Sequence, residues 1–374
     1  MANLRELRNR LASIKSTRKI TSAMKMVAAS RLRQAQEAVT NSGYYAASLG
    51  RVIERLAETV VYIRDEDITA GRPARVEVPR VLVDTKEAEK HIVVVFSSSR
   101  GLCGAFNMNV VKKAYQLLRY LEREKRSFQI ICIGTRGYEM LKSAYGDKII
   151  DHYDIPASLE QQRIAAEKMA AYILDLYDKK EIDACTVVYN HFHSAISQEV
   201  RINPLVPLRT THVLEPFAGE SPWGFKEDDE TFRIKREGGM SSAALGVIKS
   251  GSDGKMRQST RNVKIPQYQT TKVSESLNAE EENKEVFDPL AYDFEPENPQ
   301  LILQSLIPEL LTTLLYRSML DSVASENGAR MTAMDNATNN AADIIDDLTL
   351  MYNRKRQSMI TSELTEIISG AEAL

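Results

Sequence analysis

The C-terminal segment of this chain constrains its fold most, because it is predicted to form one very long helix. From about Asn298 to Leu374, good helix formers are interrupted by Pro308, Gly328 and Gly370 alone. At a rise of about 1.5 Å per residue, this helix would extend for roughly 100 Å. A compact domain cannot bury a rod of that length, so the helix must project and pack against a partner helix.

A seam of side chains in this helix advances in steps of three and four residues, which is the period of a coiled coil. Leu and Ile are scarce in the seam, whereas small and polar residues are frequent. Its members are Ala324, Asn327, Met331, Met334, Thr338, Ala341, Ile345, Leu348, Tyr352, Lys355 and Met359. The pattern predicts a helix pair with an unusually polar contact surface.

A second long helix is predicted over residues 1–58, where Asn3 can cap the first turn. Its seam starts at coiled-coil spacing with Leu4, Leu7, Leu11 and Ile14. The seam is then predicted to shift to Ile20, Met24, Val27 and Arg31, with Leu32 beside it. Because the two helices stand at opposite ends of the chain, we expect them to pair in antiparallel orientation and to bracket the residues between them.

The N-terminal helix carries a strong excess of positive charge, although the whole chain of 374 residues has a formal net charge of −2. Nine cations, which we call the basic collar, stand against Glu6 alone and leave a net charge of about +8. They are Arg5, Arg8, Arg10, Lys15, Arg18, Lys19, Lys25, Arg31 and Arg33.

Four interpretations of the basic collar remain open from the residues themselves. A solvated helix face would normally mix both signs of charge. A mitochondrial presequence is also basic and amphipathic, but here the helical pattern continues to Leu56. Nucleic acid or an anionic membrane surface would suit the charge, yet no aromatic residues interleave with it as stacking on bases requires. The fourth interpretation is contact with an acidic protein surface.

Cysteine and histidine usage argues against a metal site or a disulfide. Cys103, Cys132 and Cys185 are scattered in apolar surroundings and are predicted to be core residues in a reducing compartment. The five histidines are too dispersed for a metal cluster. The longest apolar runs, such as Ile92–Phe96, have the length of strands, so we expect no segment inserted in a membrane.

The middle of the chain, residues 91–215, is predicted to be a small α/β domain, because strand and helix patterns alternate. Strands are expected at His91–Ser99, Phe128–Ile133 and Ala184–Tyr189, with Gln198–Val206 as an edge strand. Helices are expected from about Asn107, from about Arg136 and over Leu159–Asp178. Residues 59–90 form a connection, and residues 216–298 form an insertion that is acidic in places and rich in Gly and Ser in others.

A glycine-rich turn, Arg100-Gly101-Leu102-Cys103-Gly104, follows the first predicted strand and could in principle cradle a phosphate. It matches neither G-x-G-x-x-G nor the P-loop pattern, and no Lys follows it. A tight turn is therefore favoured over a nucleotide site. No serine–histidine–carboxylate set or paired carboxylates point to catalysis either.

Several long motifs resemble the γ-subunit family of F-type ATP synthases. Ile20-Thr21-Ser22-Ala23-Met24-Lys25-Met26-Val27-Ala28-Ala29-Ser30 is similar to the family's N-terminal signature. Its C-terminal signature is matched from Glu326 to Ala341, and again from Leu348 to Ala371. The turn at Arg100–Gly104 with Asn107 fits the family's middle domain. Together with the order of domains, the resemblance covers the whole chain except the insertion.

The resemblance implies a fold and a role. The fold would be α/β plus a long antiparallel coiled coil of the two terminal helices (1–58 and 299–374), with a small Rossmann-like parallel sheet between them. The chain would be the central rotor of the complex, turning inside a ring of α and β subunits and coupling proton translocation to ATP synthesis or hydrolysis on β. It would be a non-catalytic subunit without a cofactor.

The resemblance also implies partners and contact residues. The partners would be the α, β and ε subunits, the membrane rotor ring of c subunits and, as a further candidate, δ, without nucleic acid or membrane insertion. The lever segments of β would meet Arg8, Lys15, Arg18, Lys19, Met24, Lys25 and Arg31. An upper ring contact would involve Arg356, Gln357, Thr361 and Glu366, and the bearing tip Ile367, Ile368, Ala371 and Leu374.

Two further expectations concern location and the competing function. The absence of a presequence before Met1-Ala2 favours the cytoplasmic side of a bacterial inner membrane, with an organellar inner or thylakoid membrane as the alternative. The insertion contains no cysteine, so thiol control of the kind found in chloroplast relatives is not expected. The competing function is a coiled-coil scaffold with a non-catalytic Rossmann-like domain, which would form homodimers through its long helices.

Overall fold

The computed structural model describes residues 4–83, 88–208 and 298–372, the side chains of 370–372 excepted. All of them belong to one compact unit, which comprises two long terminal helices and a central α/β domain. The predicted insertion over 216–298 lies outside the described residues, apart from Asn298.

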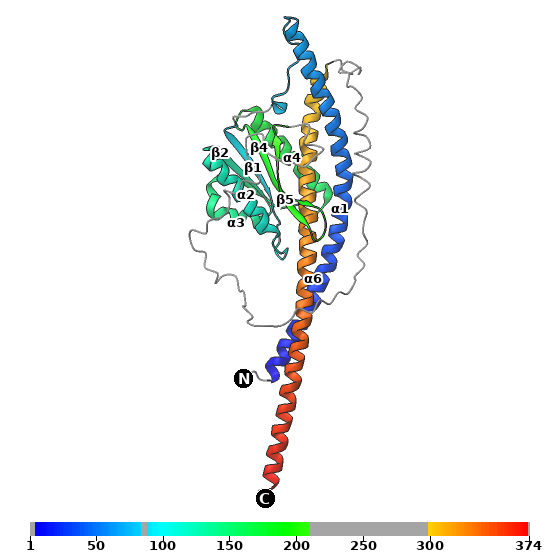
Figure 1. The fold of residues 1–374 in the computed structure, drawn as a ribbon, viewed down its shortest axis with the longest axis vertical. Coiled ribbons are helices and arrows are strands. Elements are labelled where there is room, and N and C mark those ends of the chain that lie inside the picture. Colours follow the sequence, from blue (N-terminus) through cyan, green and yellow to red (C-terminus); the bar gives the residue numbers. More distant parts are fainter. Residues whose placement is uncertain (1–3, 84–87, 209–297, 373–374) are drawn as a thin grey trace, which may run out of the picture. The chain divides into compact units, whose positions relative to one another are not determined.

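The two terminal helices, α1 (Leu4–Thr69) and α6 (Pro299–Glu372), lie side by side in antiparallel orientation (Figure 1). The Thr338 hydroxyl donates to Thr21 Oγ1 at 2.8 Å, and farther along the pair Tyr45 Oη donates to Glu309 at 3.3 Å. The predicted coiled coil is thereby confirmed. None of the described helices is long and apolar enough to cross a membrane.

Helix α1 extends beyond its predicted end near Glu58 and stops at Thr69. The physical reason is that the buried face continues through Val60 to Asp67. The Asp67 carboxylate then accepts hydrogen bonds from the backbone N–H and the guanidinium of Arg75, at 3.0 Å each, so the chain folds back only after this point. The predicted connection at 59–90 therefore begins about three helical turns late.

The predicted shift in the α1 seam is wrong. Ile20 and Val27 are exposed, whereas Thr21, Ala28, Leu32 and Ala35 are buried. With half-buried Lys25, these residues return to the three-and-four spacing of Leu4, Leu7, Leu11 and Ile14 after the exposed Arg18, and the spacing runs on to Ile53, Leu56 and Val60. The small side chains of Thr21 and Ala28 interrupt the apolar pattern in the sequence but keep the two helices in contact.

The α6 seam behaves as predicted along most of its length. Its members are buried or half-buried from Ala324 through Lys355, and Met359 is exposed. The Thr21–Thr338 contact fixes the antiparallel register, which places Leu4 beside the region of Lys355. The part of α6 beyond this point has no α1 residue among those described to pack against.

The central sheet has the strand order β3-β2-β1-β4-β5. Strands β1 (Lys90–Phe96), β2 (Ser127–Ile133), β3 (Ile149–Tyr153) and β4 (Ala184–Phe192) are parallel, whereas β5 (Gln198–Val206) pairs antiparallel with β4. Helices α2 (Phe106–Arg123), α3 (Thr135–Tyr145) and α4 (Leu159–Asp178) connect the parallel strands. Sequence patterns missed β3, because most of its short length is exposed and shows no apolar run.

One hydrophobic core joins the sheet to both long helices. On one face of β1, Ile92, Val94 and Phe96 pack in a cluster that includes residues of α4 and α6. The same cluster contains Ile53 of α1, which is fully buried. Since this packing is continuous, the α/β domain is attached to the helix pair through a shared interior, not through a loop alone.

Candidate functional site

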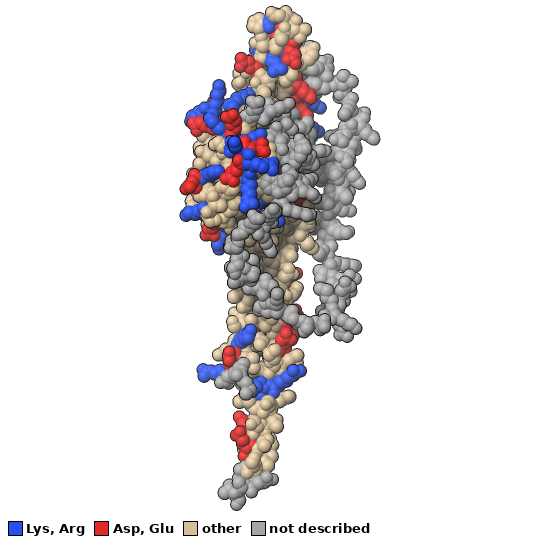
Figure 2. All heavy atoms as spheres, turned by 60° about the vertical axis from the view of Figure 1, so that its left-hand side comes forward, with Lys and Arg blue, Asp and Glu red and all other residues tan. Residues whose placement is uncertain are grey.

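The basic collar forms a solvent-exposed surface around the part of the helix pair nearest the N-terminus of α1. Figure 2 shows Lys and Arg side chains on this part of the helix pair as well as over the α/β domain. Of the residues expected to meet β, Arg8, Lys15, Arg18, Lys19 and Arg31 are exposed, whereas Met24 and Lys25 are half-buried against α6.

The opposing stretch of α6 reduces this charge only slightly. Between Asn327 and Lys355 it contains four aspartates, Asp335, Asp343, Asp346 and Asp347, and three cations. Lys25 Nζ lies 2.6 Å from Asp335 Oδ1, with the two side chains 42% and 43% exposed. An ion pair this exposed contributes little to stability. The surface therefore stays strongly positive and open to an acidic partner.

The end of α6 is a single exposed helix. Arg356, Gln357, Thr361 and Glu366 are all exposed, and the Thr361 hydroxyl donates to the Gln357 carbonyl of its own helix at 2.9 Å. Ile367 and Ile368 are also exposed, at 71% and 49%. Ala371 lies in the last turn of α6 without a described side chain, and Leu374 lies outside the described residues. This segment presents apolar side chains that nothing in the described chain covers.

The glycine-rich turn after β1 faces α6. Arg330 on α6 forms an ion pair with Glu326 at 2.7 Å and donates to the carbonyl of Gly101 at 3.2 Å. The side chains of the pair are only 10% and 13% exposed. Burial raises the pKa of Glu326, and the nearby guanidinium groups, with Arg330 first, oppose that rise. The turn therefore binds a buried arginine of α6 through its carbonyl groups.

The geometry of this turn accounts for its sequence. Leu102 and Gly104 both have positive φ, at 64° and 58°. Asn107, in the first turn of α2, accepts from the Ser98 backbone N–H at 2.9 Å and donates to Ser98 Oγ at 2.7 Å. The favoured interpretation of the motif as a tight turn agrees with these contacts, since Asn107 satisfies the backbone that a phosphate would otherwise engage.

The hairpin formed by β4 and β5 is the second attachment of the α/β domain to α6. The Ser325 hydroxyl donates to the Asn190 carbonyl at 3.2 Å, and the Thr332 hydroxyl donates to the Ala195 carbonyl at 3.1 Å. Gly328 lies between these contacts, and a Cβ there would meet the Ala195 backbone at 3.3 Å. The small and polar residues of this part of α6 thus allow the hairpin to approach closely.

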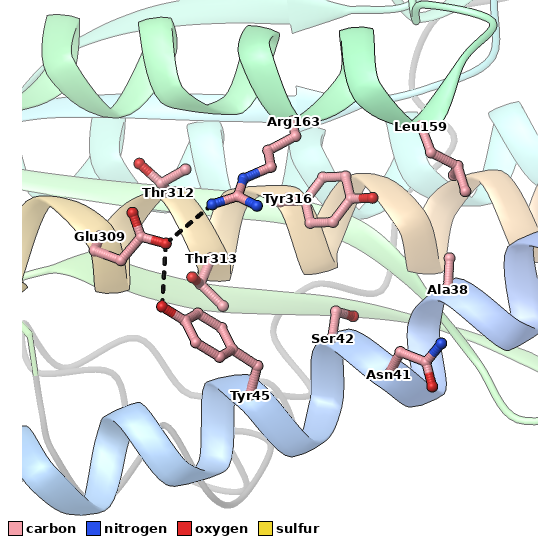
Figure 3. Close-up of a pocket in the computed structure, with 10 residues that line it drawn as sticks. All are labelled: Ala38, Asn41, Ser42, Tyr45, Leu159, Arg163, Glu309, Thr312, Thr313 and Tyr316. Atoms are coloured by element: carbon pink, nitrogen blue, oxygen red, sulfur yellow. Dashed lines mark hydrogen bonds and ion pairs between the residues drawn. The ribbon is translucent and has the colours of Figure 1, made fainter.

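A third attachment lies where α1, α4 and α6 meet, next to a cavity of about 450 Å³ (Figure 3). Tyr45 of α1 and Arg163 of α4 both point toward Glu309 of α6 (Figure 3), at 3.3 Å and 3.4 Å. One carboxylate therefore joins all three helices. Burial raises the pKa of the Tyr45 hydroxyl, and the Glu309 charge raises it further.

Sequence reasoning missed the residues that attach the domain to the shaft. Glu326 and Arg330 were recognised as part of a motif, but not as a buried pair. Their spacing of four residues on one helix was the available signal, since such side chains are neighbours. Asp321, which is buried and pairs with His191 at 3.1 Å, and Glu309 gave no local signal, because their partners are distant in the sequence.

Potential metal ligands and thiols are dispersed among the described residues. No group of three His, Cys, Asp or Glu within them is placed to hold a metal ion. The three cysteines are free and buried, and burial raises the pKa of Cys132 to about 12. A thiol with so high a pKa is a poor nucleophile at neutral pH.

Comparison with known proteins agrees with this architecture. The family model described as ATP synthase matches residues 3–374. The ATP synthase gamma chain of Pelagibacter ubique strain HTCC1062 is 33% identical, and that of Paracoccus denitrificans strain Pd 1222 is 36% identical, each over the full length of both chains. A chain of the Euglena gracilis mitochondrial ATP synthase has a similar fold, with a TM-score of 0.51 and 20% identity over 99% of this chain and 94% of that one.

Proposed function

Because the chain belongs to the ATP synthase family and matches its gamma chains over its full length, we propose that it works as a rotating shaft whose two ends serve different partners. As a γ chain it is a non-catalytic subunit of the membrane-associated complex, in the central stalk.

The observation that carries the proposal is the asymmetry of the shaft. The basic collar lies on α1. The stretch of α6 that pairs with it differs both in net charge and in the size of its side chains. A rod without symmetry presents a different face to each of three surrounding catalytic sites. Differential contact then holds the three sites in different conformations, and turning the rod exchanges those conformations.

The collar is the proposed contact with the β subunits. Arg8, Lys15, Arg18, Lys19 and Arg31 project into solvent, and Met24 and Lys25 border them. An acidic lever segment of β would be attracted to this surface, while long-range charge attraction allows sliding more readily than a large apolar interface would.

The exposed end of α6 is the proposed contact with the upper part of the ring. Arg356, Gln357, Thr361 and Glu366 would supply polar contacts, and Ile367, Ile368, Ala371 and Leu374 would form the tip in an apolar bearing. The exposure of Ile367 and Ile368 supports this role, since large apolar side chains at a free helix end need a cover. The α/β domain would bind ε and the c-subunit ring, with δ as a further possible partner.

The proposed location is the periphery of a bacterial cytoplasmic membrane, on its cytoplasmic side, where no insertion of this chain in the bilayer is required. The bacterial origin of the two gamma chains supports this location over an organellar one. Protons would be the coupled ion.

The deciding experiment is co-expression with the α and β subunits of the same organism, followed by measurement of subunit ratio and ATPase activity. We expect one copy of this chain for every three αβ pairs, and higher ATPase activity with it than without it. A stable homodimer that does not associate with α and β would overturn the rotor role and favour the coiled-coil scaffold.

A charge-reversal variant tests the collar separately. The double variant Lys15→Glu, Arg18→Glu should assemble but pump fewer protons per ATP hydrolysed, because two repulsive contacts replace two attractive ones at the lever. The charge-conserving double variant Lys15→Arg, Arg18→Lys is the control and should pump normally, because both positive charges are kept. Normal pumping by the double variant would show that the basic collar is not needed for coupling.

A further inference from the structure

The cavity of about 450 Å³ where α1, α4 and α6 meet has the size of a small-molecule site (Figure 3). Ligand pockets in proteins usually enclose about 300–1,000 Å³ and are lined mainly by apolar and aromatic groups. The lining includes the exposed side chains of Asn41, Tyr45 and Arg163, so the cavity opens to solvent. It also includes Thr312 and Thr313 of α6, which are only 6% and 5% exposed. The cavity therefore reaches from the surface to the interior.

Thr313 is the exception among the threonines of α6. The other six, Thr312 among them, donate their hydroxyl groups to the carbonyl four residues earlier, at 2.7–3.1 Å. The Thr313 side chain projects from α6 toward α1 (Figure 3), and its hydroxyl has no hydrogen-bond partner among the described residues. Its oxygen is not sealed off, since it is absent from the unpaired atoms without accessible surface. A nearly buried hydroxyl that has turned away from its own helix is open to a ligand in the cavity.

The charged side chains of the lining balance one another. Glu309 and Arg163 carry one charge each and pair at 3.4 Å. The Glu309 carboxylate also accepts a hydrogen bond from Tyr45 Oη, so it is engaged twice. A charged ligand would be repelled by one member of the pair or would have to separate the two. The lining therefore favours a neutral ligand.

Two tyrosine rings supply the aromatic surface of the cavity. Tyr45 extends from α1 and Tyr316 from α6, and Ala38 and Leu159 add apolar surface (Figure 3). Contacts between aromatic rings are favourable beyond the area that they bury. The Tyr316 hydroxyl points away from Glu309 (Figure 3), and burial raises the pKa of this group, which keeps it a neutral donor at physiological pH.

We propose that this cavity binds a neutral, planar aromatic molecule that carries a hydroxyl or carbonyl group. Its rings lie against Tyr45 and Tyr316, and its polar group forms a hydrogen bond with the Thr313 hydroxyl. An apolar cavity of about 150 Å³ holds benzene, so this larger one suits roughly ten to twenty non-hydrogen atoms. Because the ligand contacts α1, α4 and α6 together, its binding stabilises the attachment of the α/β domain to the helix pair.

Titration calorimetry on the full-length chain at neutral pH tests the ligand class with four probes of one carbon skeleton. 2-Naphthol meets every requirement, whereas naphthalene lacks the hydroxyl, decahydro-2-naphthol lacks the aromatic rings and 2-naphthoate carries a charge. We expect 2-naphthol to bind saturably and at least about tenfold more tightly than each of the others. Naphthalene, for example, would displace water from the Thr313 hydroxyl without replacing its hydrogen bond. No saturable binding of 2-naphthol, or a smaller preference over any of the other three, would overturn the proposal.

Matched variants test the position of the site. Thr313→Val keeps the shape of the side chain, and we expect it to weaken 2-naphthol binding about tenfold and to leave naphthalene binding unchanged. Thr312→Val is the control, because Thr312 is equally buried and lines the same cavity, but its hydroxyl is committed to the Pro308 carbonyl at 2.9 Å. Unchanged 2-naphthol binding in Thr313→Val, or an equal loss in both variants, would overturn the assignment.

A crystal structure of the unsubstituted chain grown with 2-naphthol decides the matter if Thr313→Val does not fold. We expect the rings to lie against Tyr45 and Tyr316, with the naphthol oxygen within hydrogen-bond distance of Thr313 Oγ1. Naphthol bound elsewhere, or ordered water alone in the cavity, would contradict the proposal.

Discussion

The two halves of α6 differ in how far their apolar residues are buried. Between Leu303 and Ala324, its apolar residues are almost wholly buried among α1, α4 and the sheet. Beyond Met359, apolar residues of the same size, Ile360, Leu364 and Ile367, are half-exposed or more. One continuous helix is thus a core element at one end and an uncovered surface at the other. The buried segment of α6 therefore stabilises the fold, and the exposed segment is available to a partner. Substitutions in the two segments should differ in their effect on the free energy of unfolding.

The largest expected effect is at the buried ion pair that joins α6 to the turn after β1. Arg330→Met leaves the Glu326 carboxylate buried without its partner, and we expect the free energy of unfolding at neutral pH to fall by about 3–5 kcal/mol. Arg354→Met, at an exposed position near the free end, should change it by less than about 0.5 kcal/mol. Urea titration of the full chain measures both.

A second substitution distinguishes lost charge pairing from lost packing at this site. The double variant Glu326→Leu, Arg330→Met removes both charges, so much of the lost stability should return. If the free energy of unfolding of the single Arg330→Met variant fell by less than about 1 kcal/mol, the pair would behave like a surface contact. The buried and exposed segments of α6 would then differ less in their contribution to stability than proposed.

Core packing gives the next largest difference. Leu315 is fully buried in the core that α6 shares with α1, α4 and the sheet. Its substitution by Ala should lower the free energy of unfolding by about 2–5 kcal/mol, because the lost contacts leave a cavity. Leu364→Ala, at a side chain 55% exposed, should change the stability of the isolated chain by less than about 0.5 kcal/mol. Urea unfolding curves of the two variants and the unsubstituted chain measure both changes in the free energy of unfolding. Equal losses at both positions would mean that the free end of α6 packs against something in the isolated chain.

A third prediction concerns the α/β domain at acid pH. Burial lowers the pKa of His91 from 6.5 to about 4, and its Nε2 lies 2.9 Å from the Ala88 carbonyl. Above pH 6.5 neither state is protonated at His91, so it has no effect. As pH falls from 6.5 to 4, the unfolded chain binds the proton first, and stability is lost. The loss reaches about 3 kcal/mol below pH 4.

The variant His91→Gln should remove this part of the pH dependence, since the glutamine amide can still donate to Ala88 and does not titrate. His152→Gln, at an exposed position, is the control and should retain it. Unfolding free energies measured at pH 7 and pH 4.5 decide the matter. An unaltered difference between the two pH values in His91→Gln would show that His91 is protonated in the folded chain as readily as in the unfolded one.

Much of the fold could be predicted from the sequence, because periodicity and apolar runs are local signals. The seam of α6 and the buried strand Ile92–Phe96 are examples. The continuation of the α1 seam beyond Ile14 on its original spacing could not be predicted, since Arg18, Thr21, Lys25 and Ala28 stand at these positions without apolar bulk. The strand Ile149–Tyr153 could not be predicted for a similar reason, because its mostly exposed side chains show no alternation of apolar and polar residues.

The candidate site divides in the same way. The basic collar and the exposed end of α6 could be located from charge and from motifs, and their individual partner contacts remain predictions. The attachments at Glu309, Asp321 and Arg330 could not be located, because each depends on groups far away in the sequence that tertiary packing brings together. A local reading of sequence therefore finds the surfaces that face partners more easily than the interior that positions them.

The smallest expected effect is at the exposed ion pair between the two long helices, Lys25–Asp335. Like Arg330–Glu326 it joins a cation to a carboxylate at a similar separation, 2.6 Å against 2.7 Å, but its side chains are about three to four times more exposed. Water and salt screen it, so a double-mutant cycle of Lys25→Met and Asp335→Asn should give a coupling energy of about 0.2–1 kcal/mol. The coupling should shrink between low salt and about 1 M salt, where the screening length falls to about 3 Å. A coupling energy above about 2 kcal/mol, or one that salt leaves unchanged, would mean that the Lys25–Asp335 pair is buried in solution. The helix pair around Lys25 would then pack as tightly as it does around Leu315.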